Sequence, residues 1–156
     1  MSTTVLDPPR TLRVCLFRLS GELLALDVRW AREVVVLEDL TAVPRTPVHL
    51  VGVANLRGHI LPILDIRPLL GLAPGRTGRG SRALVIEAAS FQVAVAIDEI
   101  LGLTSIAELI PLGEAARREF GEFGLGLLER EDGLATLLDA PKILEALRVG
   151  ASGKGD

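Results

Sequence analysis

Residues 51–71 read V-G-V-A-N-L-R-G-H-I-L-P-I-L-D-I-R-P-L-L-G, two apolar runs around a small polar island. Apolar runs on either side of a glycine, bounded by proline and glycine, predict two strands joined by a tight turn. Asn55 and Gly58 suit such a turn, because both residue types tolerate positive φ. Arg57 stands beside them among apolar residues, where an unpaired charge would be costly to bury. We therefore expect Arg57 to pair with a carboxylate or to face a partner.

Glu33, in the stretch W-A-R-E-V-V-V at 30–36, is a carboxylate that could pair with Arg57. The pair could serve the fold alone, or it could lie on a surface exposed to a partner protein; the sequence favours neither. If the pair lined an apolar groove it would serve specificity, because binding proteins use arginine as an anchor.

Further hairpins are predicted on both sides of this stretch. Residues 11–28 and 83–97 each hold two runs rich in apolar residues, with turn residues near Ser20 and Ser90. Residues 30–36 could begin as a short helical turn and continue as a strand, because their β-branched run disfavours a longer helix.

The second half of the chain repeats the order of the first. Asp27 and Asp98 each end an apolar strand, and Asp65 and Asp139 each follow another. The spacing from Asp27 to Asp98 is nearly the same as that from Asp65 to Asp139. A proline and an apolar pair come soon after Asp65 and Asp139. This pattern is typical of a carboxylate that caps a helix directly after a strand.

Gly52 and Gly126 extend the match, because each precedes its aspartate by the same distance. The shared order predicts a duplicated all-β unit, although strand–Asp–helix junctions also recur by chance in a β-rich chain. The expected fold is mainly β, with two partly open barrels of about five strands that share a core. We predict one folded domain (11–149) between a flexible lead (1–10) and a disordered tail (150–156). Within the domain we expect a first subdomain (about 11–71), a Gly/Arg-rich loop (73–82) and a second subdomain (about 82–149).

The composition bounds the functional class. A chain of 156 residues that is 49% hydrophobic can bury a sizeable core without disulfides or metals. A net charge of −3, a pI near 5.5 and only 3% aromatic residues argue against a nucleic-acid binder. One cysteine fits a reducing compartment, and no apolar run suits a signal peptide or a membrane span. We expect a cytoplasmic protein without direct membrane insertion.

Candidates for chemistry are few. Cys15 lies in a predicted strand, where cysteine is usually a small buried hydrophobe. His49 and His59 lack the companions of a zinc site, and the glycines of the 73–82 loop lack a phosphate-loop context. The arginines of that loop could touch an acidic partner, although such a run is more often solvated. We predict no enzyme, no catalytic or metal site, no cofactor and no small-molecule substrate.

Three blocks of sequence stand out together. They are P-R-T-P-V-H-L-V-G-V-A-N-L-R-G-H-I-L-P-I-L-D-I-R at 44–67, V-A-V-A-I-D-E-I at 93–100 and G-L-G-L-L-E-R-E-D-G-L-A-T-L-L-D at 124–139. The chain resembles, over about residues 12–147, the CheW-like coupling (adaptor) proteins of bacterial chemosensory arrays.

The resemblance implies two SH3-like five-stranded barrels around a shared core, with short helices. It implies a non-catalytic adaptor that couples methyl-accepting chemoreceptors to a CheA-type histidine kinase, recruited from the cytoplasm to membrane-associated receptor arrays. The kinase's regulatory domain would pair with it barrel to barrel, and the helical receptor tips would dock in a groove between the subdomains. The alternatives are a divergent protein that modulates arrays without kinase coupling, or service in a pilus or gliding pathway.

The resemblance also predicts partner-binding residues. The signature and the groove's acidic position correspond to four of them, and four apolar neighbours are inferred beside these. The predicted set is Asn55, Arg57, Gly58 and Glu33, with Val34, Val36, Ile97 and Ile100.

Overall fold

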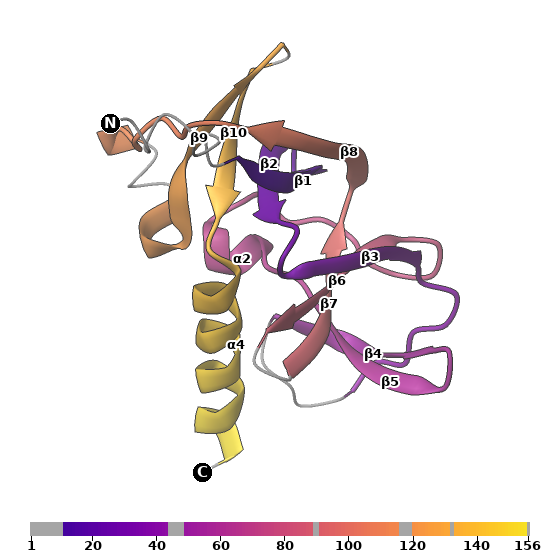
Figure 1. Cartoon of the computed structure of the whole chain (residues 1–156). Coiled ribbons are helices and arrows are strands. Elements are labelled where there is room, and N and C mark those ends of the chain that lie inside the picture. Colours follow the sequence, from indigo (N-terminus) through magenta and orange to yellow (C-terminus); the bar gives the residue numbers. More distant parts are fainter. Residues whose placement is uncertain (1–10, 44–48, 89–90, 116–119, 132, 156) are drawn as a thin grey trace, which may run out of the picture.

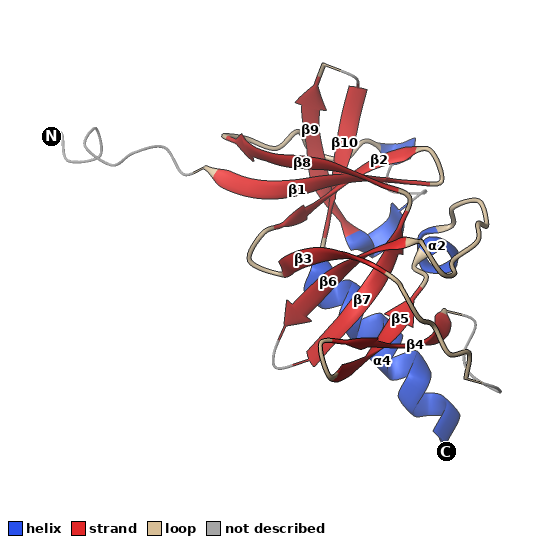
Figure 2. Ribbon diagram, turned by 90° about the vertical axis from the view of Figure 1, so that its right-hand side faces the viewer, coloured by secondary structure: helices blue, strands red, loops and turns tan. Residues whose placement is uncertain are grey.

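The computed structural model describes residues 11–43, 49–88, 91–115, 120–131 and 133–155, and side chains only as far as residue 147. Ten strands in this part of the chain form two five-stranded sheets, stacked one above the other in Figure 1 and shown in red in Figure 2. The mainly β fold predicted from the sequence is confirmed.

The first sheet has the strand order β8-β1-β2-β10-β9. Strands β2 and β10 are parallel, and the other neighbours are antiparallel. Its strands are β1 (Leu12–Leu19), β2 (Glu22–Asp27), β8 (Glu99–Ile106), β9 (Gly124–Arg130) and β10 (Gly133–Leu138).

The second sheet has the order β3-β6-β7-β5-β4 and repeats the same pattern, with β5 and β7 as its parallel pair. Its strands are β3 (Ala31–Val36), β4 (Leu50–Leu56), β5 (His59–Leu64), β6 (Arg82–Ala88) and β7 (Phe91–Ile97). Residues 28–30 form a turn, so the helical start predicted for 30–36 is wrong, and β3 begins directly after that turn.

The predicted division into subdomains 11–71 and 82–149 needs correction, because each sheet takes strands from both halves of the chain. The hairpin β1–β2 joins β8–β10, and the hairpin β6–β7 joins β3–β5. The short connection after each hairpin explains this exchange. If the halves were not exchanged, β3 would pair with β1 in the position that β8 occupies, and it would run parallel to β2. The chain would then have to return about 20 Å along the sheet between the end of β2 and the start of β3. The linking residues 28–30 can span only about 10 Å.

Two bridges link the edges of the sheets. Thr41, just beyond β3, exchanges two backbone hydrogen bonds of 2.9 Å with Val53 of β4, at the opposite edge of the second sheet. Ile110, beyond β8, exchanges two of 2.7 Å with Leu127 of β9 at the opposite edge of the first. Each bridge brings the opposite edges of its sheet together at one point, as in a partly open barrel.

Alternate residues along the strands feed separate clusters of buried side chains. Leu16 belongs to a cluster confined to the first sheet, and Ile63 to one on the second. A third cluster lies between the sheets and combines Phe17 of the first, Leu84 of the second and Ile143 of helix α4 (Ala140–Gly155). This is the shared core that the sequence predicted, with α4 packed along it (Figure 2).

The predicted caps and termini have different outcomes. Asp139 accepts the backbone N–H of Lys142 in the first turn of α4, as predicted. Asp65 accepts the backbone N–H of Arg67 at the start of helix α2 (Arg67–Leu70), but the N-cap of that helix is Ile66, so Asp65 lies one residue before the predicted cap position. Helix α4 continues to Gly155, so most of the tail predicted to be disordered is helical, since each residue added to a formed helix gains a hydrogen bond. The lead at 1–10 lies outside the described residues.

Candidate partner-binding site

Arg57 and Gly58 form the two-residue turn of the β4–β5 hairpin. Their φ angles of 50° and 86° are both positive, as in the type I′ turn that matches the twist of a hairpin. The Asn55 side-chain oxygen accepts the Gly58 backbone N–H at 2.9 Å and braces the turn. The guanidinium of Arg57 is therefore presented at the tip of a braced hairpin.

The predicted Glu33–Arg57 ion pair is confirmed. The Arg57 guanidinium donates to the Glu33 carboxylate, and their side chains are 66% and 36% exposed. The pair spans the two edge strands of the second sheet, β3 and the β4 hairpin. Because an exposed pair contributes only about 0–1 kcal/mol to stability, its charges are available to a partner at little cost to the fold.

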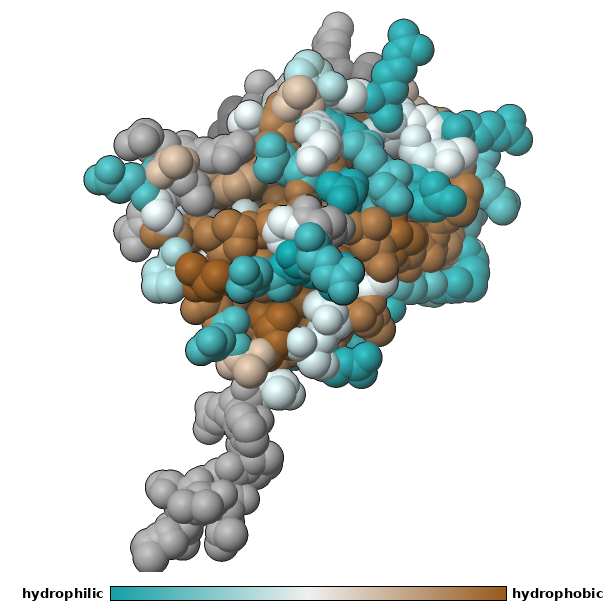
Figure 3. Space-filling model, turned by 90° about the horizontal axis from the view of Figure 1, so that it is seen from above, coloured by the Kyte–Doolittle hydropathy of each residue, from teal (hydrophilic) through white to brown (hydrophobic). Residues whose placement is uncertain are grey.

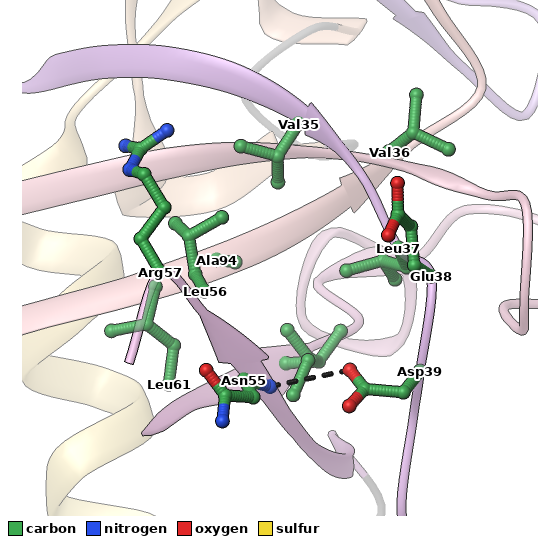
Figure 4. Close-up of a pocket in the computed structure, with 12 residues that line it drawn as sticks. Val35, Val36, Leu37, Glu38, Asp39, Asn55, Leu56, Arg57, Leu61 and Ala94 are labelled. Atoms are coloured by element: carbon green, nitrogen blue, oxygen red, sulfur yellow. Dashed lines mark hydrogen bonds between the residues drawn. The ribbon is translucent and has the colours of Figure 1, made fainter. Parts of the chain in front are cut away.

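A hollow of about 230 Å³ opens beside this pair (Figure 4). Asn55 and Asp39 face each other across it, and the Asn55 backbone N–H donates to the Asp39 carboxylate at 3.3 Å. Arg57 extends from the hairpin toward β3, with Glu38 on the opposite side. The floor of the hollow is apolar and includes Leu61. The hollow is therefore better suited to binding a side chain of a partner protein than to catalysis.

A second hollow, of about 210 Å³, lies where β3 of the second sheet approaches β8 of the first. We call it the groove. Ile100 and Leu103 line it from β8, and Glu33 and Val34 from β3. Leu103 is 59% exposed and Val34 36%, so an apolar ridge is open to a partner while a carboxylate stands beside it.

The structure divides the predicted residues between these two hollows. Glu33, Val34 and Ile100 meet in the groove, whereas Val36, Asn55 and Arg57 line the hollow in Figure 4. Val36 is 54% exposed at the end of β3. The Glu33–Arg57 pair connects the two sites, and Gly58 completes the turn beside them.

Ile97 requires a correction, because it is only 3% exposed and belongs to the shared core. It ends β7, a central strand covered on both faces, and residues 93–97 of that strand are all buried. Ile97 thus offers almost no surface to a partner.

A buried ionic cluster was missed by the sequence analysis. The Arg67 side chain is 3% exposed and donates to Asp98 at 2.5 Å, to the Ser20 hydroxyl at 3.0 Å and to Asp65 at 3.2 Å. Asp98 also accepts the Ser20 backbone N–H at 2.7 Å. The sequence noted both aspartates in its repeat, but a repeat does not reveal that one arginine binds both.

Cys15 is 4% exposed, and burial raises the pKa of its thiol, which disfavours the nucleophilic thiolate. No cluster of three His, Cys, Asp or Glu residues suited to a metal occurs in the described part of the chain. Among the described helices, none is long and apolar enough to span a membrane.

Other apolar surface lies on the first sheet. Seen from above, hydrophobic areas (brown) lie between hydrophilic side chains (teal) in Figure 3. Leu125 of β9 and Leu134 of β10 are 53% and 52% exposed, and Ile60 of β5 is 63% exposed on the second sheet. In the repeated strand order, Leu134 and Ile60 lie on corresponding strands, each a member of the parallel pair of its sheet.

The fold of this chain, with its exchanged strands, shared core and exposed groove, can now be compared with the folds of known proteins. The family model of the CheW-like domain matches residues 13–148. The chain belongs to the CheW-like domain family. The match covers both sheets and the groove.

Curated relatives of this CheW-like protein agree with that assignment. The chemotaxis protein CheW of Thermotoga maritima is 29% identical over 94% of this chain and 96% of its own length. The protein FrzA of Myxococcus xanthus is 34% identical over 70% of each chain, and the protein PilI of Pseudomonas aeruginosa is 32% identical over 67% of this chain and 61% of its own.

A solved structure shares the fold. The scaffolding protein TtCheW from Thermoanaerobacter tengcongensis superimposes with a TM-score of 0.71 at 24% identity, over 83% of this CheW-like chain and 90% of that one. The mainly β, CheW-like fold predicted from the resemblance is thereby confirmed.

Proposed function

We propose that this CheW-like protein is a non-catalytic adaptor that couples methyl-accepting chemoreceptors to a CheA-type histidine kinase in a bacterial chemosensory array. The observation that carries the proposal is the groove between the sheets, where exposed apolar side chains lie beside the exposed Glu33–Arg57 pair. Membership of the CheW-like domain family supports it.

The receptor tip is assigned to the groove. A helical hairpin presents apolar residues in a stripe, and such a stripe binds a groove of apolar side chains. Val34, Ile100 and Leu103 offer that surface, while the Glu33–Arg57 pair at its border would select the polar residues that flank the stripe.

We assign the kinase's regulatory domain to the β4–β5 and β9–β10 hairpins, each of which lies at one edge of its sheet. Ile60 and Leu134 are large apolar residues, more than half exposed, at the hairpins that end each sheet. A partner that covers these side chains would remove their apolar surface from water, which favours association. Because one lies on each sheet, barrel-to-barrel contacts at both ends would allow the chain to join a ring.

The proposal covers arrays with different cellular outputs. Relatives named CheW, FrzA and PilI all match the chain, so a flagellar, pilus or gliding system would each fit.

Binding to purified partners tests the proposal. The protein is mixed with the kinase regulatory domain and with a receptor signalling fragment encoded in the same genome, and both are expected to form complexes at about micromolar concentrations. Leu103→Asp should weaken receptor binding and leave kinase binding unchanged. Leu125→Asp, which alters a leucine of similar exposure on β9, is the matched control for the receptor arm.

The outcomes separate the alternatives. Failure of either folded partner to bind rejects the coupling role. Receptor binding without kinase binding would instead support a divergent protein that modulates arrays by competing for receptors.

A further inference from the structure

Three arginines lie close together in the loop between α2 and β6. Arg76 and Arg79 are exposed in the segment 73–82, which we call the arginine loop, and Arg82 is exposed at its end, where β6 begins. None of their guanidinium groups forms an ion pair with a carboxylate within the described part of the chain. In a protein with net charge −3, this is an unneutralised basic patch.

The arginine loop is anchored at its start. The Ser20 hydroxyl donates to the Ala73 carbonyl at 2.5 Å. Gly75 lies against the buried Arg67 guanidinium so closely that an added Cβ would be 2.8 Å from its central carbon. The ionic cluster of Arg67 therefore holds this end of the loop against the junction of the two sheets.

The other end of the arginine loop is tied to β3. The Gly80 backbone N–H donates to the Leu37 carbonyl at 2.7 Å, and Leu37 donates in return to the Ser81 carbonyl at 2.8 Å. A turn from Gly78 to Ser81 is closed by hydrogen bonds of 2.9 and 3.0 Å. Because the loop backbone is already fixed at both ends, the loop loses little conformational entropy when a partner binds its arginines.

The arginine loop adjoins the strand that lines the groove. Arg82 is directly opposite Val36 in the β3–β6 ladder. Opposed residues share a face of a sheet, with Cβ atoms about 5 Å apart. Val36 is 54% exposed and lies two residues beyond Val34 of the groove. The apolar edge of β3 thus leads directly into the basic patch.

We infer that Arg76, Arg79 and Arg82 bind carboxylates on the receptor hairpin, beyond the apolar stripe that occupies the groove. This inference rests on the proposed function and adds the chemistry of the partner: an apolar stripe followed by acidic residues. An anionic membrane fits less well, because recognition of acidic lipid uses clusters of about 4–8 basic residues and this protein is acidic overall.

Binding to the receptor signalling fragment, measured from low to high salt, tests the inference. The variant with Arg76, Arg79 and Arg82 all changed to Ala should bind about ten-fold more weakly at low salt, and its affinity should depend less on salt. Changing the same three residues to Lys should retain most of the binding. The matched single variants are Arg79→Ala and Arg13→Ala, because Arg13 is an exposed arginine on β1, away from the loop.

The result that overturns the inference is specific to the loop. If the triple Ala variant binds with unchanged affinity and salt dependence while Leu103→Asp loses binding, the loop makes no contact and the adaptor role stands. If the wild type binds neither partner, the proposed function itself fails. Flotation with phosphatidylglycerol vesicles is a second arm: vesicle binding that the triple variant loses would assign the loop to membrane and overturn the inference. Arg79→Glu alone repeats the test with a smaller change.

Discussion

Arg57 and Arg67 show how much the surroundings of one residue type determine its role. Both belong to the 51–71 stretch, and both pair with carboxylates. The Arg57 side chain is 66% exposed, whereas that of Arg67 is 3% exposed and binds three residues. The first can therefore serve recognition, while the second fixes the junction of the sheets.

Alanine substitutions should separate these roles. Arg67→Ala removes the buried partner that the Asp65 and Asp98 carboxylates share, and we expect it to lower the free energy of unfolding by about 2–3 kcal/mol, because hydrogen bonds to charged groups are lost while the 45% exposed Asp98 is solvated. Arg57→Ala should lower it by at most about 1 kcal/mol. Urea unfolding followed by circular dichroism measures both. Arg57→Glu should remain folded and bind receptor or kinase more weakly; if it unfolds outright, Arg57 is structural and its assignment to the binding site is wrong.

The sequence could predict one of these pairs and not the other. The Glu33–Arg57 pair was inferred because a lone arginine in an apolar stretch needs a carboxylate, and a nearby half-buried stretch offers one. The Arg67 cluster joins Ser20, Asp65 and Asp98 from three segments. Only the exchange of strands between halves brings these segments together, and no local pattern encodes it.

At the scale of elements, two glycines mark the places where each sheet closes. Gly52 on β4 lies beside Thr41, and Gly126 on β9 lies beside Ile110. An added Cβ on Gly52 would be 2.4 Å from the Thr41 carbonyl oxygen, and one on Gly126 would be 3.1 Å from that of Ile110. The sequence placed both glycines in its repeat, but their reason is a close backbone approach that only the closed sheets show.

Alanine at these glycines should affect stability unequally. Gly52→Ala forces the Thr41 segment away and breaks the bridge to Val53, so we expect a loss of about 2–3 kcal/mol. Gly126→Ala should cost about 1 kcal/mol, because its contact is looser. Gly78→Ala, which meets nothing within 4 Å, is the control and should be close to neutral. Equal melting temperatures for all three variants would contradict the assignment of the glycines to closure.

The strands of the predicted hairpins at 11–28 and 83–97 were predictable within a residue or two, because apolar runs ended by turn residues carry that information, whereas β8 was not predicted. The predicted hairpin at 83–97 matches β6 and β7, and the turn near Ser90 lies outside the described residues. The start of β3 was less certain, since Trp30 and Ala31 also suit a helix. Hydrogen bonds that tie Trp30 to Asp27 and to Glu87 hold it in the turn before the strand.

At the scale of the whole molecule, the repeat and the exchange are separate facts. The sequence predicted two similar halves, and the two sheets do share one strand order. Local pattern could not tell which hairpin joins which set of three strands, because either pairing buries the same apolar faces. The short connections at 28–30 and at Asp98 decide it, since neither can return the chain along a full strand.

The exchange makes a prediction for the separated halves. Residues 1–77 carry β1–β5 and residues 78–156 carry β6–β10, so neither fragment holds a complete sheet. We expect each fragment alone to lack a cooperative thermal transition, because its hairpin has no partner strands and the shared core is absent. An equimolar mixture should recover the strand signal in circular dichroism and a single transition. The intact protein cut after residue 77 is the control and should stay folded, since the hydrogen bonds that tie Gly80 and Ser81 to Leu37 lie beyond the cut. A fragment 1–77 that folds cooperatively by itself would mean that β3–β5 can pair with their own hairpin, and the exchange would then not be required by the chain.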